Sequence, residues 1–282
     1  MIGLKPSTYR YKPKVSRLVR ETRDADIRDK IEDLQVRYTN CRGYRTVRVY
    51  LEKDFQLTVN PKKIRRVMKK YALVRRSRRR FINTTDSKHG FAVYPNLLKG
   101  KEVTDINQVW VSDITYIRIL TGFVYLAVIL DVYSRKVIGW ALSKLIDHQL
   151  TLKALRMAIQ DRKPPAGIIH HSDRGVQYAC TGYVNELKEN HFQISMSRPG
   201  NPYDNAHAET FMKTFKQEEV YLKEYETFTD VIENVPGFIE AAYNRKRIHS
   251  GIDYLTPDEF ESILKDEEKK KERGFDTLIL WS

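Results

Sequence analysis

Three acidic residues, Asp113, Asp173 and Glu209, stand in separate local contexts that suit metal-dependent phosphoryl transfer. Asp113 lies within a run of β-branched and aromatic residues, where an acid is otherwise disfavoured. Asp173 closes another apolar run, directly before Arg174 and Gly175, and Glu209 opens a helical stretch after a turn-rich segment. Carboxylates at a strand centre, a strand end and a helix start can converge on a pair of divalent cations.

The acids alone prove little, because the chain has 36 Asp and Glu residues and many triples would show any chosen spacing. Their surroundings are more specific. Several blocks resemble, in order, the integrase-type core of DDE transposases, most closely the second-frame product of the insertion-sequence three family. They are residues 110–116, 130–140, 171–178, 200–211 and 243–257. The resemblance covers residues 44–260.

The resemblance implies an α/β fold: a ribonuclease H-like integrase catalytic core, with a mixed five-stranded sheet and flanking helices, preceded by a small all-α helix-turn-helix domain. It also implies that Asp113 and Asp173 bridge or flank two Mg²⁺ ions while Glu209 holds the second ion, with Mn²⁺ as a substitute. Such a site serves both strand cleavage by water and strand transfer by a 3′-hydroxyl. Lys216 matches the basic residue that the family places to contact DNA near the cut.

Several polar residues near these acids have two interpretations. Asn201, Asp204 and Asn205 would grip the DNA end, or they simply favour turns and helix caps. Lys216 would contact DNA, or it is an ordinary surface lysine, as Lys213 is expected to be. For Asp131, structural anchoring with Ser134 or Arg135 is favoured over metal binding. Four histidines are expected to be structural, because Mg²⁺ prefers oxygen ligands: His170, His171, His207 and His249.

Positive charge is concentrated at the front of the chain. The net charge is +14, yet residues 1–100 contain 27 basic and 9 acidic residues, whereas the remainder contains 23 basic and 27 acidic residues. This asymmetry predicts a polyanion-binding region attached to a nearly neutral catalytic body. The alternative is a solvated basic face.

The front region reads as short helices with apolar stripes. The first stripe comprises Ile27, Ile31, Leu34 and Tyr38, and the second comprises Val47, Tyr50 and Leu51. Asn60 and Pro61 predict the start of a third helix, with Ile64, Val67, Met68 and Tyr71 on its inner face. Its outer face is basic, as in a recognition helix: Lys62, Lys63, Arg65, Arg66, Lys69 and Lys70.

An arginine cluster follows this helix. Five of the six residues at 75–80 are arginines, which suit bidentate phosphate contacts. The alternative is a solvated linker. The cluster comprises Arg75, Arg76, Arg78, Arg79 and Arg80.

From residue 105 onward the pattern changes to strands. Runs at 109–120, 123–132 and 136–143, joined by short turns, predict an antiparallel meander, and further strands are expected at 168–171 and 192–196 with helices between them. We therefore expect a basic arm at 1–23, a helix-turn-helix-like domain at 24–74, a basic linker at 75–104, the core at 105–260 and a charged tail at 261–282.

Other features limit the function classes. No stretch approaches the ~20 apolar residues that a membrane span needs, and an N-terminal apolar signal is missing. The two cysteines, Cys41 and Cys180, do not suggest a disulfide framework, and only Cys41 and His89 in the first hundred residues are soft metal ligands, so a His-His-Cys-Cys zinc module cannot form. We expect a cytoplasmic, nucleoid-associated bacterial protein.

Together these features predict a transposase subunit that cleaves and joins DNA by in-line attack of water or a 3′-hydroxyl on a phosphodiester. The expected partners are the element's terminal repeats, target DNA, further copies of the chain on DNA, and a first-frame protein acting as a fusion or a separate subunit. No leucine zipper is evident, since the first apolar stripe ends after about one and a half heptads. The alternatives are a non-catalytic DNA-binding regulator and a metal-dependent nuclease without strand transfer.

Overall fold

The computed structural model describes residues 16–38, 43–74, 90–198 and 205–279. The chain divides into two compact units, Met1–Arg76 and Ser77–Ser282. No helix in the described segments combines the length and apolar character that crossing a membrane requires.

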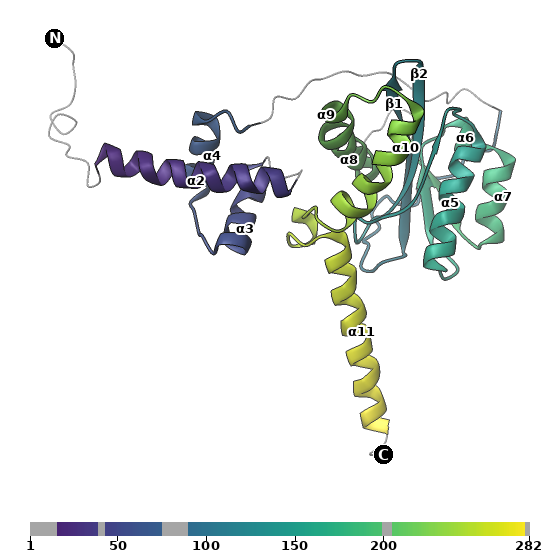
Figure 1. Cartoon of the computed structure of the whole chain (residues 1–282). Helices are drawn as coiled ribbons and strands as arrows, with labels where there is room; N and C mark the ends of the chain where they lie inside the picture. Colours follow the sequence, from purple (N-terminus) through teal and green to yellow (C-terminus); the bar gives the residue numbers. More distant parts are fainter. Residues whose placement is uncertain (1–15, 39–42, 75–89, 199–204, 280–282) are drawn as a thin grey trace, which may run out of the picture. The chain divides into compact units, whose positions relative to one another are not determined.

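The described part of the first unit is a bundle of three helices, α2 (Arg17–Arg37), α3 (Tyr44–Phe55) and α4 (Pro61–Lys70) (Figure 1). Each helix packs on the other two. The predicted apolar stripes form its core, since their central members are all buried: Ile27, Ile31, Leu34, Val47, Tyr50, Leu51, Ile64, Val67 and Met68. Tyr38 and Tyr71 lie at the helix ends and are half-buried.

Local capping explains where these helices begin. Asn60 accepts a hydrogen bond from the backbone N–H of Lys62 at 2.9 Å, and Pro61 occupies the first helical position, as predicted. Ser16 caps α2 in the same way, so α2 begins at Arg17 and includes residues that we expected in the N-terminal arm. Gln56 adopts a left-handed φ of 50° and ends α3.

The second unit is built on a five-stranded sheet in the order β3-β2-β1-β4-β5. Its first three strands form the predicted antiparallel meander, and β4 and β5 run parallel to β1. The strands are β1 (Val109–Ile119), β2 (Gly122–Asp131), β3 (Val137–Ser143), β4 (Ile169–Ser172) and β5 (Gln193–Met196).

Helices cover both faces of the sheet (Figure 1). One face carries α5 (His148–Arg162), α6 (Val176–Ala179) and α7 (Thr181–Glu189). The other face carries α8 (Ala206–Phe215), the π-helix η2 (Lys216–Val220), α9 (Tyr221–Lys223), α10 (Phe228–Gly237) and the π-helix η3 (Phe238–Asn244). This strand order with helices on both faces is the ribonuclease H-like architecture, as predicted.

Gly139 lets β3 approach α5 closely. A Cβ at this position would lie 2.3 Å from the carbonyl oxygen of Ala154 and 2.8 Å from the Cβ of Ala158. Only a glycine therefore fits between the strand and the helix without moving one of them.

The C-terminal helix α11 (Pro257–Ile279) is fastened to this unit by buried polar groups. Glu261 accepts hydrogen bonds from the Ser134 hydroxyl and from Arg162, each at 2.6 Å. Asp131 accepts from the backbone N–H groups of Asn107 and Ser134. The prediction that Asp131 anchors the turn after β2 together with Ser134 is thus confirmed.

Candidate active site

Two of the three predicted acids lie on neighbouring parallel strands. Asp113 is on β1, and Asp173 directly follows β4. Val111 pairs with His171 across these strands, so each acid lies two residues beyond a matched pair and both reach the same level of the sheet. Local backbone bonds orient them: Asp113 accepts from the N–H of Ile114 at 2.8 Å, and Asp173 accepts from the N–H of Gly175 at 2.9 Å.

Glu209 approaches the same place from a helix. It lies in the first turn of α8, which packs against β1 and β2, and its side chain is exposed. The pKa of the Asp113 carboxyl is raised to about 7, first by burial and then by the negative charges of Asp173 and Glu209. Partial desolvation also raises the pKa of Glu209. The three acids therefore share one electrostatic environment, although they come from distant parts of the sequence.

This environment suits a divalent cation. All three side chains offer oxygen donors, which Mg²⁺ prefers, and their mutual repulsion would be relieved by a bound positive charge. Within the described residues, no group of three or more His, Cys, Asp or Glu side chains is placed so that it could hold a metal ion. In this arrangement the three acids therefore do not form a closed metal site by themselves.

Lys216 faces the same cluster. It follows the last residue of α8, at the point where the helix changes to the π-helix η2, and its positive charge lowers the pKa of Asp113. Its Nζ lies 4.0 Å from the centre of the Tyr116 ring, a cation–π contact. Lys216 is half-buried, whereas Lys213 is exposed, so the two lysines differ as expected. Tyr116 is a site residue that the sequence did not reveal.

Of the three polar loop residues before α8, the structure describes Asn205. Asn205 is buried, and its side-chain amide donates a hydrogen bond to the backbone carbonyl of Ser112 at 3.1 Å. This bond ties the start of α8 to β1 directly beside Asp113. Asn201 and Asp204 lie outside the described residues.

The predicted structural roles of the histidines agree with their contacts. His171 is buried and bonded to the hydroxyls of Ser195 and Ser197. His170 is bonded to the Tyr183 hydroxyl, and burial lowers the pKa of this histidine to about 3. Two further histidines are half-buried: His207 is hydrogen-bonded to Arg135, and His249 packs on the ring of Tyr243.

In the first unit, the basic face of α4 is largely open to solvent. Lys62, Arg65, Lys69 and Lys70 are exposed, and Lys63 is half-buried. Arg66 differs from them, because its guanidinium makes two hydrogen bonds, at 2.7 and 2.8 Å, to the buried carboxylate of Asp24 on α2. This pairing lowers the pKa of Asp24. The predicted contacts at Arg75, Arg76, Arg78, Arg79 and Arg80 lie outside the described residues.

Family models match most of the described chain. Two integrase core domain models match residues 104–202 and 190–257, and a helix-turn-helix-like domain model matches residues 21–81. The chain is 36% identical over 242 residues to an uncharacterised 31 kDa protein of insertion element IS600 from Shigella sonnei, covering 86% of this chain and 89% of that protein.

It is also 37% identical over 204 residues to the transposase InsF for insertion sequence IS3A from Escherichia coli (strain K12), covering 72% of this chain and 71% of that protein. Among solved structures, the catalytic core domain of BIV integrase aligns with a TM-score of 0.42 and 19% identity, covering 58% of this chain and 99% of that domain.

Proposed function

The chain belongs to the IS3 family of transposases, and we propose that it cleaves DNA strands at the ends of an insertion sequence and joins them to target DNA. The main support for this proposal is that Asp113, Asp173 and Glu209 share one electrostatic environment. Burial, and then the charges of the other two acids, raise the pKa of Asp113. Acids in this arrangement are unfavourable without a positive partner, which suggests selection for chemistry rather than for stability.

Asp113, Asp173 and Glu209 would hold two Mg²⁺ ions, with Mn²⁺ as a substitute. Bound ions would activate the attacking oxygen and stabilise the leaving oxygen of the phosphodiester. The chain itself orients the ligands: the backbone N–H groups of Ile114 and Gly175 fix the two aspartates, and the bond from Asn205 to Ser112 fixes the start of α8.

DNA would be held by two groups of basic residues. Lys216 would contact the terminal nucleotides beside the acids, since it is directed at Asp113 and supported by the ring of Tyr116. The exposed face of α4 would bind the duplex, with the arginines at 75–80 adding phosphate contacts. We further propose that the chain acts as a homo-oligomer on DNA, and that a first-frame protein supplies most of the specificity for the terminal repeats.

The acids are tested by Asp113→Asn, Asp173→Asn and Glu209→Gln in the full chain, assayed on a labelled duplex that carries an element end. We expect each substitution to abolish both cleavage and joining with Mg²⁺ while DNA affinity stays nearly unchanged. A variant that retains more than about one-tenth of the activity would remove its residue from the catalytic set, because loss of one carboxylate ligand normally costs several orders of magnitude.

The same assay separates the alternatives. Cleavage without joining by the parental chain would indicate a nuclease, and binding without any cleavage would indicate a regulator. Band-shift measurements with the isolated chain test the partner proposal, because a large preference for element ends over random duplex at physiological salt would contradict it.

A further inference from the structure

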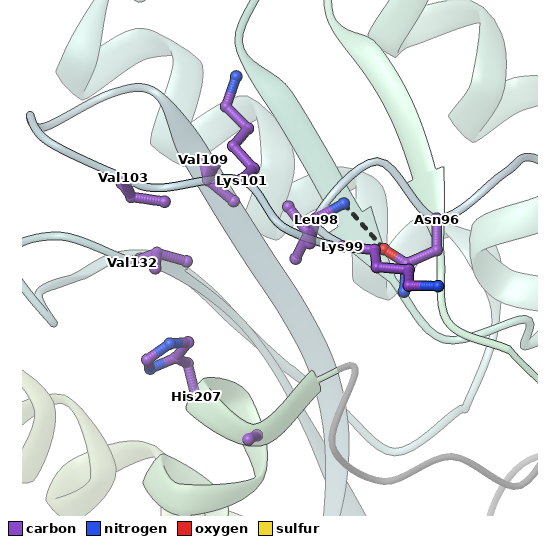
Figure 2. A pocket seen from close by; sticks show the side chains of 9 residues that line it. Asn96, Leu98, Lys99, Lys101, Val103, Val109, Val132 and His207 are labelled. Carbon is purple, nitrogen blue, oxygen red and sulfur yellow. Dashed lines mark hydrogen bonds between the residues drawn. The ribbon is translucent and has the colours of Figure 1, made fainter.

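A pocket outside the acidic cluster lies beside the first turn of α8. It has a volume of about 460 Å³, and its lining includes Lys101, Arg135, His207 and Asp253. A neighbouring hollow of about 310 Å³ shares Lys101 and His207 with it. Figure 2 shows this second hollow, with His207 on α8 facing the segment that carries Val132. Neither is lined by Asp113, Asp173 or Glu209, so these hollows are separate from the proposed catalytic site.

Arg135 is held in this pocket by a left-handed backbone conformation and by contacts of its side chain. It adopts a left-handed φ of 65° in the turn after β2, and its backbone N–H donates to the carbonyl of Asp131 at 3.0 Å. From this turn the side chain reaches α8, where Nη1 bonds to Nδ1 of His207. Gly251 closes one side, since a Cβ there would lie 3.4 Å from Nη2. The guanidinium position is therefore fixed by contacts to separate elements.

Burial partly removes the Arg135 guanidinium from water, which lowers its pKa. In the part of the chain that the structure describes, no acid forms an ion pair with Arg135, and its Nε is buried without a hydrogen-bond partner. A cation that is partly removed from water without a counter-charge is costly to the folded state. Ion pairs satisfy other partly buried arginines of this unit, as Glu261 does for Arg162.

We propose that this pocket, here called the Arg135 pocket, binds a phosphate of the DNA backbone. The planar guanidinium suits a phosphate, and the exposed Lys101 adds a second positive charge, which outweighs the single acid Asp253 in the lining. His207 and Glu209 both lie in the first turn of α8, and residues two apart on a helix point to opposite sides, so the pocket would meet a different stretch of the DNA from the one at the acids. The inference rests on the proposed function, because it assumes that DNA is the substrate.

The test compares Arg135→Gln and Lys101→Ala with Arg156→Gln in the full chain, using a fluorescent duplex of random sequence in EDTA. Arg156 is a matched control, because it loses the same charge from α5 on the other face of the sheet, where its side chain is 62% exposed. We expect Arg135→Gln to weaken binding about tenfold. Each of the two pocket variants should also flatten the salt dependence by ~0.9.

Equal affinity and equal salt slope for Arg135→Gln and Arg156→Gln would overturn the proposal. If Arg135→Gln fails to fold, Lys101→Ala decides the outcome, because Lys101 is exposed. The readout is binding without divalent ions, so a parental chain that binds in this way but never cuts DNA would contradict the proposed function and leave the pocket assignment standing.

Inorganic phosphate distinguishes the source of the ligand. Thermal unfolding of the parental chain in phosphate, compared with chloride at equal ionic strength, should show stabilisation that Arg135→Gln lacks. Added duplex should remove this difference by occupying the pocket. Stabilisation by phosphate that duplex leaves unchanged would assign the pocket to free phosphate and overturn its assignment to DNA.

Discussion

At the residue scale, the positions of the three acids in the fold were predictable, because Asp113 lies in a strand-like run, Asp173 ends another and Glu209 opens a helical stretch. Tyr116 was not, since its role depends on a contact between β1 and a residue one hundred positions later. Arg66 was assigned to the basic face of α4 by helical spacing alone, and its partner Asp24 lies on another helix. Sequence spacing thus identifies which residues share an element but not which elements meet.

Lys216→Ala should weaken binding of a pre-cleaved element end and reduce strand transfer more than it reduces nicking of arbitrary duplex. Removing a charge-assisted phosphate contact costs on the order of 1.5–3 kcal/mol, or one to two decades in affinity or rate. Tyr116→Leu should show the same selectivity with a smaller effect, because it removes the ring beneath the ammonium. Lys213→Ala is the control, and equal small effects of Lys213→Ala and Lys216→Ala would contradict the terminal-contact role.

Without bound metal, the chain should become less stable as the pH rises, because of Asp113. Its folded pKa of about 7 is above the ordinary value of 3.8, so its stabilising contribution is complete below the ordinary value and is lost as the pH rises through 7. In EDTA at about pH 8, Asp113→Asn should therefore raise the unfolding temperature by roughly 2–8 °C. This difference in unfolding temperature between Asp113→Asn and the parental chain should vanish in acid and become smaller with Mg²⁺. The same difference at every pH would show that the charge of Asp113 is not its cause.

At the element scale, the strands were predictable because their apolar and β-branched runs are long and separated by turns. The extents of α2 and α11 were not, because both helices extend into charged segments without an apolar stripe. In α2 the added residues 18–23 are exposed, so their helical state depends on the Ser16 cap and on local propensity. The change from α to π geometry at Lys216 also has no signal in the sequence.

Gly139→Ala tests the packing of β3 on α5. Because the new Cβ would lie 2.3 Å from the carbonyl oxygen of Ala154, the helix must move, and we expect a loss of about 1–3 kcal/mol in the free energy of unfolding. Gly237→Ala is the matched control, since that glycine is helical and has no atom within 4 Å of the added Cβ. The free energy of unfolding of Gly237→Ala should increase by roughly 0.4–1 kcal/mol. Chemical denaturation measures both, and similar values would contradict the close-packing argument.

At the scale of the whole molecule, the charge asymmetry and the change from helical to strand patterns both predicted a basic helical region followed by an α/β core. Composition is informative at this scale because it averages over many residues. Composition reveals nothing about pockets. The Arg135 pocket depends on contacts of one side chain, from the turn after β2, with His207 on α8 and with Gly251.

Simultaneous Gln substitution of Lys62, Lys63, Arg65 and Lys69 should lower the affinity of the full chain for duplex DNA and flatten the salt slope by ~0.9 per lost phosphate contact. Arg66 is left intact because its loss would leave the buried charge of Asp24 unpaired and destabilise the helical unit. Fluorescence anisotropy across a salt series measures the slope. An unaltered slope would show that this face of α4 does not touch DNA.

The parallel pairing of β1 with β4 also sets the point during synthesis at which the proposed catalytic acids can come together. The basic helices and the antiparallel meander leave the ribosome first, and their contacts are local. Asp173 arrives only after α5 has crossed the sheet, and Glu209 arrives later still. Under the proposed function, a growing chain would therefore bind DNA before it could cut it, and a polypeptide released early would bind DNA without cutting it.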